Sequence, residues 1–215
     1  LLLVPMLPLF ASSSFQQIKT LYHTIIFEET YEKEAQIVAS FADEVFETLS
    51  QELSYTPKRR IPVILTGTTS WANGYFSTFP SKVTLFITSD ESLFLGARSS
   101  SWLYSLFVHE LTHYIHLTNR VGPAAFFEPI FGPEVTVMNM PFMPGWWIEG
   151  ITTYNETHFA PGGRGDNQRF LSILRSAIHD DSMWSLAKGS YSSVLGPSGR
   201  IYLTGYLMVE YIIRT

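Results

Sequence analysis

The clearest hydrophobic pattern in the chain covers residues 28–53. Apolar residues recur there at spacings of three and four, separated by Glu, Lys and Gln: Ala35, Val38, Ala39, Ala42, Val45, Phe46, Leu49 and Leu53. This spacing puts one apolar stripe along a helix. We therefore predict a long amphipathic helix over residues 28–53, which Pro57 prevents from continuing.

Short runs rich in β-branched and aromatic residues lie on either side of this helix and predict strands. They are residues 20–27 (TLYHTIIF), 61–66 (IPVILT) and 82–88 (KVTLFIT). Between the last two, Asn73-Gly74 and Pro80 are typical of turns, with a candidate edge strand at 75–79.

Helical patterns dominate the second half of the chain. A serine run at 99–101 can cap a helix over residues 102–117, and further helices are predicted at 146–159, 170–178 and 202–213. No capping signal precedes Thr215, so we expect the last helix to be cut short there. Residues 122–145 contain five prolines and no sustained period, which predicts a long irregular loop, and 160–166 (APGGRGD) predicts a glycine-rich one.

This order of elements predicts an α+β fold. A strand, a helix and two further strands would form a small mixed sheet packed on the helix at 102–117, followed by a mainly helical lobe. A chain of 215 residues that is 46% hydrophobic can bury one substantial core, so we expect residues 15–215 to form one domain.

Charge and cysteine content narrow the function. The net charge is −5 and no basic run exceeds Lys58-Arg59-Arg60, which disfavours a nucleic-acid partner. There is no cysteine, so any transition-metal site must use histidine and carboxylate ligands. Residues 1–14 resemble the apolar core and small-residue end of a secretory signal and predict an extracytoplasmic location; a buried strand or apolar tail is the alternative.

The candidate chemistry lies in FVHELTHYIHL, residues 107–117. His109 and His113 stand four residues apart, so a helix puts both imidazoles on one face, where they can bind one ion. Glu110, next to the first histidine, would then face a water on that ion. A zinc site of this kind needs a third protein ligand.

Spacing narrows the choice of that ligand. One class of site requires glycine and histidine at positions that His116 and Asn119 occupy here, so that class is excluded. A carboxylate from a second helix remains. We predict Glu149 as the ligand, with Glu156, on nearly the same helical face, hydrogen-bonding a ligand histidine. The other candidates are Glu128 and Glu134, which adjoin prolines in the predicted loop, and Asp166.

HELTH followed by WWIEGITTYNE resembles the gluzincin metallopeptidases, the thermolysin-like and alanyl-aminopeptidase-like group. The closest resemblance is to the peptidase-MA-like domains of bacterial secreted proteins, some of which continue into a β-propeller. It extends from residue 15 onward and includes the GGRG at 162–165. The resemblance implies a zincin-like fold, one Zn²⁺ per chain on His109, His113 and Glu149, and a peptide or protein substrate.

The resemblance also implies a residue that stabilises the oxyanion. Aminopeptidase-like gluzincins carry a tyrosine for this purpose in a Tyr-x-x-Gly helix start. IYLTGYLMVEYI gives Tyr202 this role, with Gly205 completing the pattern and Tyr206 as the alternative. Asn73 and Gly74 are candidate substrate-binding residues, because an edge strand at 73–79 could pair with an extended peptide.

We therefore expect a zinc-dependent peptidase that hydrolyses peptide bonds with a zinc-bound water activated by Glu110. The Gly-Ala-Met-Glu-Asn sequence with which aminopeptidases hold a free amino terminus is missing, so endo- and exopeptidase both stay open. The alternative is a catalytically inactive zincin-fold binding or scaffold domain of a larger secreted protein, followed by a further domain such as a β-propeller.

Overall fold

The computed structural model describes residues 15–215 except 69–72, 88–98, 193–195 and 198, and at 99–101, 133 and 137–139 it describes the backbone alone. The predicted signal remnant at 1–14 lies outside these residues. Within the described part of the chain, no helix combines the length and apolarity needed to cross a bilayer.

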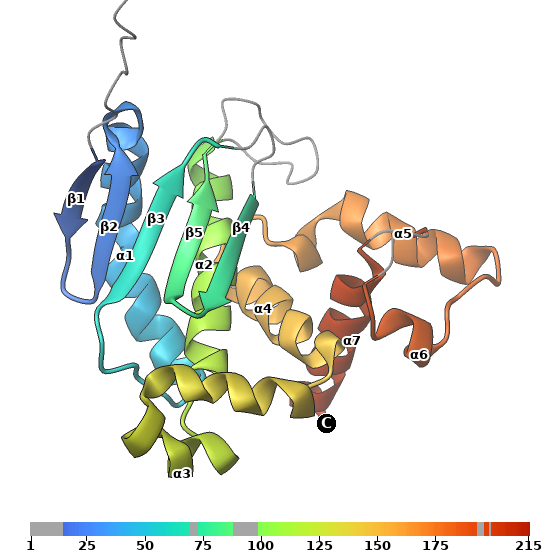
Figure 1. Ribbon diagram of the computed structural model, residues 1–215. Helices are drawn as coiled ribbons and strands as arrows, with labels where there is room; N and C mark the ends of the chain where they lie inside the picture. The colour runs from blue at the N-terminus through green and yellow to red at the C-terminus, as the bar shows by residue number, and fades with distance from the viewer. Residues whose placement is uncertain (1–14, 69–72, 88–98, 193–195, 198) are drawn as a thin grey trace, which may run out of the picture.

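Five strands form one mixed sheet in the order β1-β2-β3-β5-β4 (Figure 1). They are β1 (Phe15–Lys19), β2 (His23–Glu28), β3 (Ile61–Thr66), β4 (Asn73–Thr78) and β5 (Ser81–Phe86). The three central strands are parallel, whereas β1 and β4 pair antiparallel at the two edges. The predicted edge strand is therefore confirmed, and β4 is the strand that faces the helical half of the molecule.

Two long helices, α1 (Glu32–Glu52) and α2 (Ser99–Leu117), cover one face of the sheet (Figure 1). The apolar stripe predicted from the sequence turns α1 toward the strands, with Val38, Ala42 and Leu49 fully buried. Helix α2 is apolar on almost every side, which is typical of a helix surrounded by protein. The motif at 109–113 therefore lies inside the molecule.

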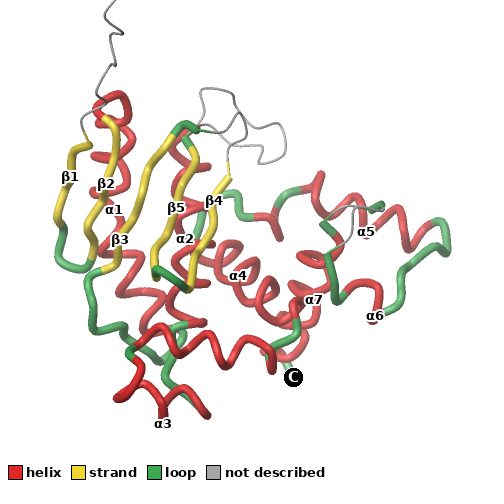
Figure 2. Tube along the Cα trace, in the orientation of Figure 1, coloured by secondary structure: helices red, strands yellow, loops and turns green. Residues whose placement is uncertain are grey.

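Helices make up the rest of the chain (Figure 2). Helix α4 (Gly145–Phe159) packs between α2 and α7 (Arg200–Arg214), while the smaller α5 (Gln168–His179) and α6 (Leu186–Gly189) lie beyond α7. Short 3-10 segments connect them: η1 (Glu29–Tyr31), η2 (Pro133–Phe142) and η3 (Arg164–Asp166). The predicted α+β fold is confirmed, with the sheet packed on α2 and the helical lobe after it.

The predicted turn at Asn73-Gly74 is wrong. Both residues begin β4, where they pair with Phe86 and Leu85. The glycine is needed for a close approach instead, because a Cβ at Gly74 would lie 2.8 Å from Cγ of Glu110. The hairpin turn lies at the other predicted position, Pro80.

The long loop predicted at 122–145 is also wrong, since it contains α3 (Gly122–Phe131) and η2. Prolines at the first turn of each segment are compatible with a helix, because the first-turn amides need no helical partner. The helical period is absent because α3 buries only Ala124 among its residues and leaves large apolar side chains exposed.

The strand predicted at 20–27 begins later, at His23, because 20–22 form the turn that follows β1. Asp43 of α1 holds this turn: its carboxylate accepts hydrogen bonds from the Thr20 hydroxyl at 2.7 Å and the Leu21 amide at 2.7 Å. A contact between residues this far apart in sequence leaves no local pattern, so the sequence alone places 20–22 in the strand rather than in a turn.

Candidate metal centre

His109 and His113 project from consecutive turns of α2 toward α4. Their ring centroids are 4.9 Å apart, and both side chains are buried. The i, i+4 spacing explains why the two imidazoles lie on one face. The packing of α2 on the sheet and on α4 explains why that face is shielded from solvent.

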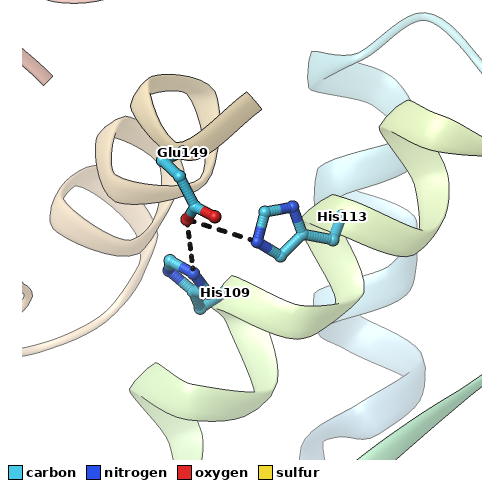
Figure 3. Close-up of side chains that lie close together, drawn as sticks. All are labelled: His109, His113 and Glu149. Carbon is cyan, nitrogen blue, oxygen red and sulfur yellow. Dashed lines mark ion pairs between the residues drawn. The ribbon is translucent and has the colours of Figure 1, made fainter. Parts of the chain in front are cut away.

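Glu149 approaches the two histidines from the first turns of α4 (Figure 3). Its Oε2 lies 3.6 Å from Nε2 of His109 and 3.5 Å from Nε2 of His113. One ligand atom from each of the three side chains lies within 4.8 Å of the others. Helices α2 and α4 thus meet at this point, although 27 residues, 118–144, separate them in the chain.

These three residues fit a tetrahedral metal ion. Oε2 of Glu149 is buried and has no hydrogen-bond donor among the described residues. Its distances to the two nitrogens are too long for hydrogen bonds, but zinc–ligand bonds of about 2.0–2.2 Å put neighbouring ligand atoms about 3.3–3.6 Å apart. Two imidazoles and one carboxylate are also the donor set of catalytic zinc sites that keep a position open.

The electrostatics of the site favour a cation. Burial acts to raise the pKa of Glu149, but the two imidazoles outweigh it and hold this pKa well below its usual range. Burial and Arg164 act to lower the pKa of His109, but the carboxylates of Glu149 and Glu156 outweigh them and raise it to about 9. The carboxylates of Glu149 and Glu156 therefore stabilise a positive charge at this site, which can be a proton on His109 or a metal ion.

Glu156 lies behind His109, away from Glu149. Its Oε2 is 3.0 Å from Nδ1 of His109, and its side chain is buried. Burial acts to raise the pKa of Glu156, but Arg164 and His109 outweigh it and lower it, so a carboxylate accepts the Nδ1–H proton. Such a partner fixes the imidazole with Nε2 free to bind metal, which is the arrangement predicted for Glu156.

Two glycines bring α4 and α7 into backbone contact. A Cβ at Gly150 would lie 2.5 Å from the carbonyl oxygen of Gly205, and a Cβ at Gly205 would lie 2.3 Å from that of Trp146. The first glycine follows Glu149, and the second comes one turn after Tyr202. The close crossing therefore sets both side chains against the histidines.

Tyr202 lines the cleft above the three ligands, with its ring centroid 6.2 Å from that of His109. Burial raises the pKa of its hydroxyl, with Glu149 adding to the effect, so the hydroxyl keeps its proton and can donate a hydrogen bond. Tyr206 instead packs against Gly165. A Cβ added at Gly165 would lie 2.6 Å from the Tyr206 ring. The geometry favours Tyr202 over Tyr206 for the predicted role.

The cleft has a volume of about 490 Å³ and runs between β4 and α4. Glu110 points into it from α2, against Gly74 of β4, and is almost fully buried. Asn73 and Gly74 both line the same cleft. The predicted base and the predicted substrate-binding residues thus lie beside the predicted metal ligands.

The remaining carboxylate candidates lie elsewhere. Glu128 pairs with Arg120 at 2.7 Å, and Glu134 lies 3.9 Å from Arg59. Asp166 ends η3 and is not part of the group formed by the two histidines and Glu149.

Sequence reasoning missed Arg164, which also lines the cleft. Its guanidinium lies over the Tyr202 ring, 4.7 Å from Cζ to the ring centroid, and its Nε is 3.5 Å from Oε2 of Glu156. The available signal was an arginine between two glycines in a predicted loop. Nothing local to that loop indicates that it turns back to α2.

Comparisons with known proteins do not show the family to which the chain belongs. No family model matches the chain. Over 201 residues, or 91% of the chain, it is 35% identical to an uncharacterized protein of Treponema pallidum (strain Nichols), of whose length it spans 17%. An aminopeptidase N family protein from Idiomarina loihiensis has a similar structure at a TM-score of 0.45 and 17% identity, over 92% of this chain and 36% of that one. The candidate site therefore rests on the geometry of its own residues.

Proposed function

We propose that this chain is a zinc-dependent peptidase of the gluzincin type. The observation that carries the proposal is the meeting of His109, His113 and Glu149 beside Glu110 in one cleft. Zinc held by these three residues would supply a Lewis acid that acidifies water and polarises the scissile carbonyl.

Within this proposal, each neighbouring side chain has a defined task. A carboxylate oxygen of Glu110 takes a proton from the attacking water and passes it to the leaving amine. Tyr202 donates a hydrogen bond to the oxyanion, a contribution worth roughly 10²–10³ in rate for a well-placed donor. Glu156 keeps the Nδ1 proton on His109 and so holds its Nε2 toward the ion.

The edge strand β4 supports a peptide as substrate. It borders the cleft along its whole length, and its outer edge is unpaired in the described sheet. An extended peptide can add to such an edge through backbone hydrogen bonds. Asn73 and Gly74 would then contact the substrate next to Glu110.

Two measurements test the proposal. Elemental analysis of purified protein should find one zinc per chain, and Glu149→Ala should lose it, because two imidazoles alone bind zinc weakly. A library of unmodified peptides should be cleaved by the zinc-loaded protein, and Glu110→Gln should slow cleavage by about 10²–10⁴-fold while keeping the zinc.

Absence of zinc from the wild-type protein after dialysis against it would contradict the metal site. Zinc without cleavage of any peptide would instead favour the alternative, an inactive zincin-fold binding domain of a larger extracytoplasmic protein.

A further inference from the structure

Arg164 reaches the cleft because glycines surround it. Gly162 adopts a left-handed backbone with φ of +77°, and a Cβ at Gly163 would lie 2.4 Å from the carbonyl oxygen of Glu156. Gly165 donates its amide hydrogen to the Thr157 hydroxyl at 2.9 Å, and a Cβ there would lie 2.6 Å from that oxygen. Larger residues at positions 163 and 165 would push the loop away from α4. The glycines therefore allow the loop to place Arg164 in the cleft.

The guanidinium uses few of its five donors. Nε makes a long 3.5 Å contact with Glu156, and the flat face lies over Tyr202. Nη1 is buried and has no hydrogen-bond partner among the described residues. The guanidinium therefore forms no two-bond fork with Glu156, and its exposed part is left to meet an acceptor in the cleft.

Charge in the cleft points to the nature of that acceptor. Arg164 is the one arginine or lysine among the described residues that line the cleft, whereas Glu110 and Glu149 are acidic. About a fifth of its side chain is exposed, 19%, and the residue lines the cleft. A planar guanidinium matches a carboxylate better than any other group a peptide offers.

We propose that Arg164 binds a carboxylate of the peptide substrate, either its C-terminus or an Asp or Glu side chain. This rests on the proposed peptidase function and adds a substrate class to it. Tyr202, held under the guanidinium, and the carboxylate subsite would then border the same end of the cleft.

Binding, measured apart from cleavage, tests the proposal. Zinc-loaded Glu110→Gln protein would be titrated calorimetrically with three versions of one N-acetylated tetrapeptide: free acid, C-terminal amide, and amide with one internal glutamate. At least one of the two anionic peptides should bind about 10- to 100-fold more tightly than the neutral amide, since hydrogen bonds between charged groups contribute this much. Which of them does so distinguishes a terminal from a side-chain carboxylate.

Variants identify the residue responsible. In the Glu110→Gln background, Arg164→Met should reduce the preference for the anionic peptide to less than about twofold, because the guanidinium supplies the paired donors. Arg175→Met, at an exposed arginine of α5, removes the same charge away from the cleft and should leave the preference unchanged. Zinc content and thermal unfolding check that each variant is folded.

Arg164→Lys keeps a positive charge beside Glu156 and serves if Arg164→Met fails to fold. It should lower the preference at least threefold, because an ammonium lacks the guanidinium fork. Equal binding of all three peptides, binding of none, or a preference that persists in both Arg164 variants would overturn the proposal. A carboxylate preference in protein whose wild type cleaves nothing would keep this subsite and reject the peptidase.

Discussion

The sheet half of the molecule and the helical half bury different kinds of side chain. Between β2 and the end of α2, the buried set is mostly large and apolar, and includes Phe27, Phe46, Phe107 and Leu111. In α4 the buried residues are Gly150, Thr152, Thr153, Asn155 and Glu156. The first half thus has a large hydrophobic core, whereas α4 buries small and polar residues and α7 adds the apolar Ile201, Leu203 and Val209.

This difference separates the parts of the candidate site. His109, His113 and Glu110 belong to the well-packed half, where α2 is held on every side. Glu149, Glu156, Arg164 and Tyr202 belong to the half that depends on glycine crossings and an ion-pair network. We therefore expect global stability to depend mainly on the first half, and the geometry of the site on the second.

The largest expected effect is the loss of core packing in Phe107→Ala. Phe107 is fully buried and packs edge-on against two other rings. Its ring centroid lies 5.6 Å from that of His23 and 5.5 Å from that of Phe41. Its removal should lower the free energy of unfolding by about 3–5 kcal/mol. Urea unfolding measures this, with Phe126→Ala, at an exposed phenylalanine of α3, as the matched control. Equal losses in both variants would contradict the idea that the core stabilises the sheet half.

Gly205→Ala should have a smaller effect on stability and a larger one on the metal site. The added methyl overlaps the Trp146 carbonyl, so we expect a loss of about 1–3 kcal/mol in unfolding free energy. Because α4 must move away, zinc affinity should fall, as a competitive chelator would measure. Tyr211→Ala, at an exposed position of α7, is the control. Unchanged zinc affinity in Gly205→Ala would mean that the helix crossing does not position Glu149.

The loss of stability at acid pH should depend on His23, in the sheet half of the molecule. His23 is fully buried, with Nδ1 3.0 Å from Asp43 and Nε2 without a hydrogen-bond partner among the described residues. Burial lowers the pKa of His23, although Asp43 acts to raise it. The unfolded chain binds this proton near pH 6.5 and the folded protein only at lower pH, so stability falls as pH drops below 6.5.

His23 should contribute up to about 1.4 kcal/mol per pH unit to that slope, the value for one proton. Urea unfolding at pH 7.5, 6.5 and 5.5 should show a shallower slope in His23→Leu than in the wild type. His179→Leu, at an exposed histidine of α5, serves as the control. A wild-type slope retained in His23→Leu would assign the acid sensitivity to another group.

The smallest expected effect belongs to the surface of the helical half. Arg214 pairs with Glu210 four residues earlier on α7, and its side chain is 74% exposed. Exposed pairs of this kind contribute about 0–0.5 kcal/mol, so Arg214→Ala should barely shift the unfolding midpoint. A loss above about 1 kcal/mol would mean that surface pairs, rather than the glycine crossing, hold this half together.

Local sequence determined much of this protein. The three-and-four spacing in α1 and the β-branched runs of β2, β3 and β5 are set by the side-chain periods of helix and strand. The i, i+4 spacing of His109 and His113 follows from the same helical geometry. For that reason these elements, and the pairing of the two imidazoles, could be predicted without any knowledge of the fold.

Tertiary structure decided the rest. The sequence suggested a turn at Gly74, but this position has no room for a side chain because Glu110 packs against it. At Gly205 the same restriction arises because α4 crosses there. Arg164 has no local pattern that points to the cleft, and reaches Tyr202 and Glu156 only through the path of its loop. A close approach between distant segments requires only a single small or charged residue and produces no periodic pattern in the sequence. Local patterns could therefore not predict these contacts.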